Sequence, residues 1–298
     1  MKTIDPQAVS VAEFHSYLLG TVAPRPIAFA STVDGNGRVN LSPYSFFNAF
    51  GSNPPTLIFS PNRRVRDDTP KHTYENVKQV AEVVINVVDY KMVEQMSLAS
   101  CEYERGVDEF VKAGFTPVAS TLVRPPRVAE SPAAFECKVL QVVEMGDRGG
   151  APNLVICQVL LAHFHDHILD AQGRVDTTRV DLVARMGGDW YCRAHGPALF
   201  EVPKPNQHRG IGIDGLPAAV RNSAILTGNN LGRLANVEKL PDPGAVQTFR
   251  QESFIREAFE RLAGQPARLE SHLHVLAKQF LEANQVERAW LTLLQQPG

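Results

Sequence analysis

An arginine held between two prolines is the first feature of this chain with the chemistry to bind an anion. Arg25 lies in residues 21–29, between Pro24 and Pro26. Proline fixes its own φ, lacks an N–H donor and restricts the preceding residue, so the guanidinium extends from a stiff support. An ordinary salt bridge at a surface or interface is the alternative role for this arginine.

A hydroxyl, two aromatic rings and an amide lie within four residues at the end of a second segment, residues 40–48. Ser45 and Asn48 carry short side chains that can donate to an anion or to a carbonyl-rich ring. Phe46 and Phe47 supply flat apolar surface, although core or dimer packing suits them better than ring stacking. With Arg25, this set suits a molecule that has a phosphate at one end and a planar heterocycle at the other. Alone, Ser45 and Asn48 would equally suit a turn and a strand cap.

A third candidate group lies at a predicted helix start. Thr73 can act as the N-cap, and the backbone N–H groups at a helix start attract phosphate. Lys71 adds a mobile positive charge, although a solvated helix lysine explains it too.

Short strands joined by tight turns must position these side chains. Residues 27–33 and 38–41 flank an Asp-Gly-Asn-Gly turn, which is typical of a hairpin. Many short strands with few long helices favour an antiparallel barrel over a doubly wound parallel sheet. The further expected strands are residues 56–60, 83–88, 135–144 and 153–165, and the expected helices are 73–80 and 91–100, with 102–114 irregular.

The strand pattern stops near residues 203–206, a proline-containing polar stretch. Beyond it, residues 247–262, 268–281 and 285–294 have apolar side chains at helical spacing. We therefore expect a β-rich domain over residues 1–202 and a mostly helical extension over residues 203–298.

Composition and charge narrow the class of protein. The chain has 298 residues, 44% of them hydrophobic and 21% charged, and its net charge of −2 gives no reason to expect nucleic acid or an anionic membrane as partner. No apolar run reaches the roughly 18 residues of a membrane helix, and the N-terminal residues do not resemble a secretory signal. A cytoplasmic location is the default expectation. The four cysteines form no C-x-x-C pair, so we expect reduced, mostly buried thiols.

Two other motifs are tempting but weak. His163, His165 and His167 alternate along a predicted strand, so their rings share a face, but no acidic residue supports a metal site there and none is expected. Residues 210–215 match G-x-G-x-x-G in letters only, because a dinucleotide fingerprint needs a preceding strand and a βαβ unit.

The ordered set of motifs resembles the flavin reductase-like proteins, the family of flavoredoxin and of the reductase components of two-component monooxygenases. The similarity covers about two-thirds of the chain. It rests on residues 24–28, 40–48, 71–77, 83–86, 114–117, 125–128, 136–137 and 185–191.

The resemblance implies a mainly β fold with some α, an FMN-binding split β-barrel of antiparallel Greek-key type, followed here by the C-terminal helices. It also implies a homodimer with flavin at its interface, FMN as cofactor with FAD possible, and NAD(P)H as electron donor. The activity implied is that of an NAD(P)H:flavin reductase-like oxidoreductase that relays hydride through flavin to an acceptor. A flavin-binding electron carrier or sensor without turnover is the alternative. No side chain is nominated as catalytic, because the cofactor performs the redox chemistry.

The family's site residues carry over by motif. The flavin-binding candidates are Arg25, Pro26, Ile27, Ser45, Phe46, Asn48, Ser60, Lys71, His72 and Thr73. Two positions depart from the family pattern. His72 stands where an aspartate is common, which leaves its role open. Arg148 stands where many short flavin reductases carry a histidine near the nicotinamide, which puts the nicotinamide partner in question.

Overall fold

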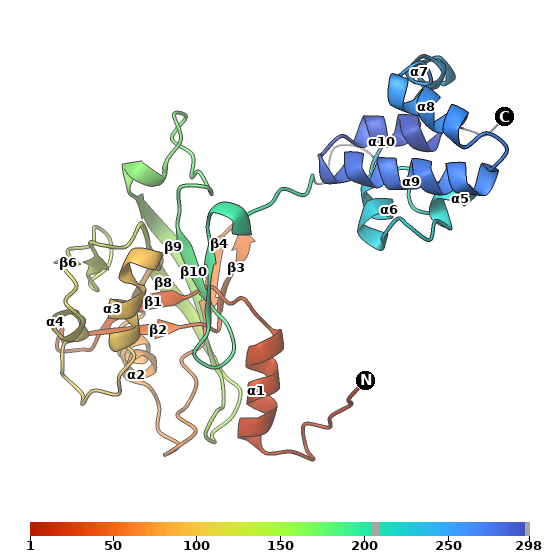
Figure 1. The fold of residues 1–298 in the computed structure, drawn as a ribbon. Helices are drawn as coiled ribbons and strands as arrows, with labels where there is room; N and C mark the ends of the chain where they lie inside the picture. The colour runs from red at the N-terminus through yellow and green to blue at the C-terminus, as the bar shows by residue number, and fades with distance from the viewer. Residues whose placement is uncertain (204–208, 296–298) are drawn as a thin grey trace. The chain divides into compact units, whose positions relative to one another are not determined.

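The computed structural model describes residues 1–203 and 209–295 of the chain. Its contacts divide into two compact units, Met1–Phe200 and Glu201–Gly298 (Figure 1). We call these the barrel unit and the helical unit, and describe each by itself.

The barrel unit is built on one antiparallel seven-stranded sheet with strand order β2-β1-β5-β8-β9-β4-β3. The predicted hairpin is present, with Ser31 opposite Leu41 and the Asp34 side chain accepting hydrogen bonds from turn N–H groups. The strands of this sheet are β1 (Ala28–Val33), β2 (Val39–Tyr44), β3 (Phe47–Ser52), β4 (Pro55–Phe59), β5 (Glu82–Asn86), β8 (Ala133–Glu144) and β9 (Asn153–Phe164).

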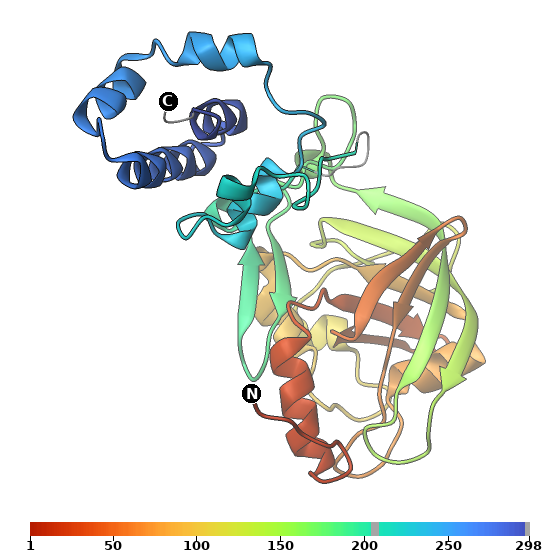
Figure 2. The same ribbon diagram turned by 90° about the vertical axis from the view of Figure 1, so that its right-hand side faces the viewer.

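The sheet is curled rather than flat (Figure 2). The long β8–β9 hairpin shifts register twice, between Glu136 and Cys137 and between Val139 and Gln141. Such bulges bend a strand and increase its twist. Two small two-stranded sheets complete the unit: β6 (Pro117–Val118) with β7 (Arg127–Val128), and β10 (Leu182–Arg185) with β11 (Tyr191–Ala194).

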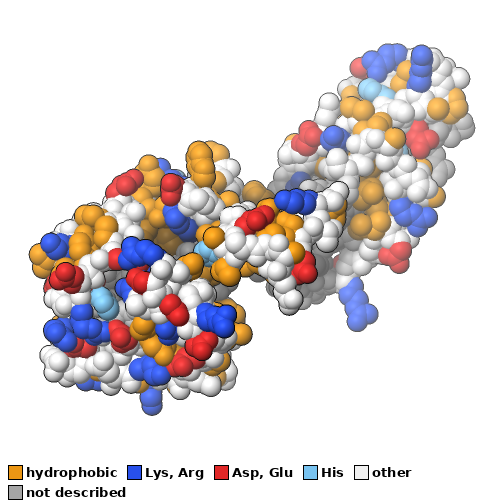
Figure 3. Space-filling view, turned by 90° about the horizontal axis from the view of Figure 1, so that it is seen from below, with side chains coloured by type: hydrophobic (Ala, Val, Ile, Leu, Met, Phe, Trp, Pro, Cys, Tyr) orange, Lys and Arg blue, Asp and Glu red, His pale blue; other side chains and the backbone are white. Residues whose placement is uncertain are grey.

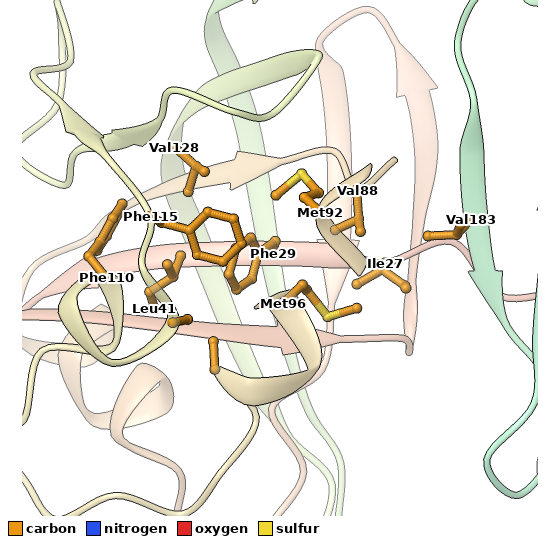
Figure 4. Packing of buried hydrophobic residues seen from close by; sticks show 12 residues of the cluster. Ile27, Phe29, Leu41, Val88, Met92, Met96, Phe110, Phe115, Val128 and Val183 are labelled. Atoms are coloured by element: carbon orange, nitrogen blue, oxygen red, sulfur yellow. The ribbon is translucent and has the colours of Figure 1, made fainter. Parts of the chain in front are cut away.

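Four α-helices accompany the sheet in the barrel unit: α1 (Val11–Thr21), α2 (His72–Gln79), α3 (Val93–Leu98) and α4 (Glu109–Ala113). On one side of β1, Phe29 packs edge-on against Phe115, with ring centroids 5.2 Å apart. Met92, just before α3, and Met96, on α3, lie beside this pair (Figure 4). A second core forms around Phe59 and Ile85. Of the four cysteines, Cys137 and Cys157 are buried, and burial raises the pKa of Cys137 to about 12.

The helical unit has its own apolar core, in which Trp290 is fully buried and donates its indole N–H to the Leu234 carbonyl at 3.1 Å. Its helices are α5 (Ala218–Arg221), α6 (Gly228–Leu234), α7 (Pro243–Phe249), α8 (Ser253–Arg261), α9 (Pro266–Glu282) and α10 (Val286–Leu293).

Three local predictions were wrong. The predicted continuous helix over 247–262 is instead two helices, α7 and α8. The first of them begins earlier than predicted, because Asp242 caps it, and it ends at Phe249. The segment 102–114 is not wholly irregular, since Asp108 caps the short helix α4. The N-cap of α2 is Lys71 rather than Thr73, and it makes no side-chain capping bond.

The view in Figure 3 shows basic and acidic side chains interspersed rather than gathered into fields of one sign. No helix within residues 1–203 and 209–295 is long and apolar enough to span a bilayer.

Candidate functional site

A cavity of about 900 Å³ opens beside the Ser45 corner of the barrel unit. We call it the basic cavity. One wall comes from α1 and is mainly apolar, with Val11, Phe14 and Leu18 beside His15. The corner between β2 and β3 contributes Ser45 and Phe46. The loop after β4 and the start of α2 supply its polar end, with Ser60, Asn62, Arg63, Arg64, Arg66 and Lys71, together with Glu102.

Three cations surround one carboxylate at this polar end. Glu102 receives Arg64 Nε at 3.0 Å, Arg66 Nη2 at 2.8 Å and Lys71 Nζ at 3.3 Å. Partial burial pushes the pKa of Glu102 upward, but the Lys71 hydrogen bond and the charges of Arg66 and Arg64 together hold it below its usual value. Arg66 Nη2 also lies 3.3 Å from the Asp67 carboxylate, so three cations face two carboxylates. The net charge of this group is still positive, so the polar end attracts anions.

The loop that carries these arginines is folded back on itself. Arg64 Nη1 donates to the Pro70 carbonyl at 2.5 Å, and Arg63 Nε donates to Asp68 at 2.9 Å. Sequence reasoning missed Arg63, Arg64 and Arg66. Their signal was present as an Asn-Arg-Arg-Val-Arg run directly after a buried strand and a proline.

A second cavity, of about 630 Å³, adjoins the first. We call it the tyrosine cavity, because Tyr90 and Tyr191 line it. It shares Pro43, Ser45 and Ser100 with the basic cavity, so the Ser45 corner lies where the two meet. Ile27, one of the predicted flavin contacts, lines this second cavity and not the first.

Arg25 is buried, and its guanidinium faces main-chain carbonyls. Nη1 donates to Leu19 at 2.8 Å and to Val22 at 2.7 Å, and Nη2 donates to Met186 at 2.8 Å. Nε lies 3.5 Å from the Ser45 hydroxyl. Arg25 therefore joins the C-terminal end of α1, which walls the basic cavity, to the β10–β11 turn. Neighbouring Pro26 is exposed.

Ser60 and Thr73 are buried in hydrogen-bond networks beneath the basic cavity. The Ser60 hydroxyl donates to Asn62 at 2.6 Å and accepts from the Asn153 N–H at 3.0 Å. Thr73 Oγ1 accepts from Asn40 at 2.9 Å and from the Tyr44 hydroxyl at 2.8 Å. Ser60 reaches the cavity lining, whereas Thr73 lies behind it.

Asn48 and His72 lie outside both cavities. Asn48 is exposed on β3, and its Oδ1 accepts from the Ala49 N–H at 2.8 Å. His72 is half-buried beside Lys71, and its pKa is lowered by burial and by the charges of Arg105, Arg64 and Lys71. Of the ten predicted contacts, the structure thus gathers Ser45, Phe46, Ser60 and Lys71 around one cavity.

His163, the first residue of the histidine motif, contacts a buried carboxylate. His163 Nε2 lies 2.7 Å from the buried Glu136 carboxylate, which also accepts from the Thr121 and Leu122 N–H groups. In the described parts of the chain, no group of three or more His, Cys, Asp or Glu side chains is arranged to hold a metal. The G-x-G-x-x-G letters at 210–215 fall in a turn.

The basic cavity fits a flavin nucleotide on chemical grounds. A cationic end and an apolar helix wall in one cavity provide for a phosphate and for a planar ring at the same time. The cavity volume is in the range that encloses cofactor-sized molecules.

Comparison with known proteins agrees with this fit. The family model "Flavin reductase like domain" matches residues 20–179. An uncharacterized protein of Halalkalibacterium halodurans is 34% identical over 208 residues, which cover 69% of this chain and 99% of the relative. Component B of nitrilotriacetate monooxygenase from Bacillus cereus superposes with a TM-score of 0.63 at 26% identity, over 68% of this chain and 98% of that one.

A protein with a split barrel domain from Shewanella frigidimarina superposes with a TM-score of 0.58 at 25% identity, over 68% of this chain and 99% of that one. The predicted fold, a split barrel followed by C-terminal helices, is confirmed.

Proposed function

The chain belongs to the flavin reductase-like family, and from that premise we propose that it is an FMN-binding oxidoreductase whose flavin lies in the basic cavity. The observation that carries the proposal is the pairing of a cationic end, Arg64, Arg66 and Lys71, with the apolar wall of α1. FAD is the alternative flavin. Bound flavin would supply the redox chemistry by accepting hydride from NAD(P)H and passing electrons to an acceptor.

The chain's own residues bind and orient. Lys71 and Arg66 are the best candidates for the phosphate, because Arg64 is engaged with the Pro70 carbonyl that shapes the loop. Phe14 and Leu18 of α1 would exclude water from the ring. The Ser45 hydroxyl, at the junction of the cavities, would donate to a ring carbonyl or a ribityl oxygen.

A titration of the purified protein with FMN and with riboflavin, followed by flavin fluorescence, tests this assignment. We expect Lys71→Gln and Arg66→Gln each to weaken FMN by about tenfold, the scale of one charged hydrogen bond, and to leave riboflavin nearly unchanged. Lys138→Gln, an exposed lysine on β8 that lines neither cavity, is the matched control. Protein that retains no flavin after gel filtration would contradict the proposal.

Stopped-flow mixing of the FMN-loaded protein with NADH and with NADPH tests turnover. Rapid bleaching of the flavin absorbance is the expected result for a reductase. Bound flavin that reacts with neither nucleotide would instead favour an electron carrier or sensor.

A homodimer is part of the proposal, supported by apolar side chains exposed on and beside the edge strand β3. Phe46 is 38% and Phe50 64% exposed, and Asn48 lies on the same strand. Covering this edge with a second copy would remove the apolar surface from water. Light scattering should give the mass of a dimer, and Phe50→Lys should shift it toward the monomer. A cytoplasmic location also stays a prediction.

A further inference from the structure

The tyrosine cavity contains a guanidinium that has no acidic partner among the residues that the structure describes. Arg185, at the end of β10, is half-buried and lines the cavity. Its side chain lies over the Tyr191 ring, with the guanidinium carbon 4.7 Å from the ring centroid. Within residues 1–203 and 209–295, no carboxylate comes within ion-pair distance of Arg185.

A second uncompensated arginine lies next to it. Arg25 pairs with Arg185 through two backbone hydrogen bonds, of 2.9 and 2.8 Å. In the described part of the chain, its own guanidinium bonds to three carbonyls and the Ser45 hydroxyl and to no carboxylate. Burial and the Arg185 charge both lower the pKa of Arg25. Arg25 lines neither cavity, but its buried charge adds to that of Arg185, and the Arg185 side of the cavity therefore favours an anion.

The other charged groups of the cavity do not cancel this preference. Arg193 is neutralised by Asp181, at 2.7 and 2.5 Å, and stacks 3.9 Å from the Tyr90 ring centroid. Glu94 and Asp189 also line the cavity, but both are exposed, so water and salt screen their charges more strongly than that of Arg185.

We propose that the tyrosine cavity binds an aromatic carboxylate, with the carboxylate paired to Arg185 and the ring against the apolar lining of Ile27, Val93 and Met96. Arginine pairs with a carboxylate through two parallel N–H donors, and the apolar side chains of the lining would remove the ligand's ring from water. This ligand would be the second substrate of the flavin, since the cavity meets the basic cavity at Ser45; that assignment rests on the proposed function.

Calorimetric titration with benzoate and with its neutral isostere benzamide tests the site. The titrations are made on the FMN-loaded and on the flavin-free protein. We expect benzoate to bind more tightly than benzamide, Arg185→Gln to weaken benzoate at least tenfold without changing benzamide, and Arg185→Lys to restore part of the loss. Arg256→Gln, an exposed arginine on α8 that lines neither cavity, should change neither affinity.

Equal affinities for benzoate and benzamide, or benzoate binding that survives Arg185→Gln, would overturn the inference. The inference would also be overturned if benzoate does not bind and Arg185→Gln instead weakens the binding of NADH. The anion held by Arg185 would then be a nucleotide phosphate. Discrimination of benzoate by protein that never binds FMN would leave the site standing while the proposed function fails. Circular dichroism of each variant shows whether it is folded.

Discussion

The barrel unit and the helical unit differ in what they bury. Among the described residues, the barrel unit buries charged groups such as Arg25, Glu109 and Glu136, each hydrogen-bonded to backbone. The helical unit buries mainly apolar side chains around Trp290, with His274, Thr292 and Gln295 as its buried polar residues. Burying a charge costs free energy unless the charge is paired or hydrogen-bonded. These charged groups therefore lie where the loops of the barrel unit bring backbone partners to them. Both proposed sites belong to the barrel unit.

Trp290→Ala should have the largest effect and would test whether the two units are independent. Removing a fully buried indole and its bond to Leu234 should cost the helical unit about 3–5 kcal/mol. We expect calorimetry to show the loss of one unfolding transition, while FMN titration is unchanged. A single transition that shifts as a whole, with FMN binding lost, would mean that the units fold together.

Arg25→Ala should destabilise the barrel unit by roughly 3 kcal/mol, because the Leu19, Val22 and Met186 carbonyls lose their charged donor. Arg25→Lys should recover only part of this, since an ammonium cannot reproduce the planar fork. Urea denaturation measures both variants. Weaker FMN binding at unchanged stability would show that Arg25 contacts the flavin directly rather than joining α1 to the β10–β11 turn.

Glu136 should make the barrel unit sensitive to acid. Burial raises its pKa, but the Thr121 and Leu122 N–H groups and His163 outweigh burial and hold the pKa below the usual value. Its stabilisation is therefore complete above the ordinary pKa of about 4.3 and is lost as pH falls through the lower, folded value. Glu136→Gln should lower the free energy of unfolding by about 2 kcal/mol at neutral pH, and the variant should then lose less stability on acidification than the wild type.

Urea melts from pH 6 to pH 3 measure this dependence. Glu104→Gln, at an exposed loop glutamate, is the control and should follow the wild type. An unchanged acid slope in Glu136→Gln would contradict the role given to Glu136.

Glu102→Gln should have the smallest effect. Without the carboxylate, Arg66 and Lys71 become available to a phosphate, so FMN should bind up to about fivefold more tightly, a gain of roughly 1 kcal/mol for partly exposed pairs. Riboflavin affinity should not change. Glu104→Gln, two residues away, should change neither. Weaker FMN binding in Glu102→Gln would show that the carboxylate holds the cations in place instead of competing with the phosphate.

Local pattern was enough to predict the strands, the hairpin at Asp34 and the helical character beyond residue 209, because apolar periodicity and turn residues act over a few positions. It also pointed to Ser45, Phe46 and Lys71, and the family resemblance added Ser60; all four line one cavity. Local pattern could not show whether Thr73 caps a helix or bonds to other side chains. In the structure Thr73 faces Asn40 and Tyr44, and this direction depends on strands far away in sequence.

The sequence by itself determined the family, the split-barrel fold with helices after it, and the presence of an arginine between two prolines. Only the tertiary structure decided where that arginine points, namely at carbonyls brought from α1 and the β10–β11 turn, and which cations gather around Glu102. Spacing along a chain sets local conformation, whereas electrostatic partners are chosen by distances between segments that folding alone brings together.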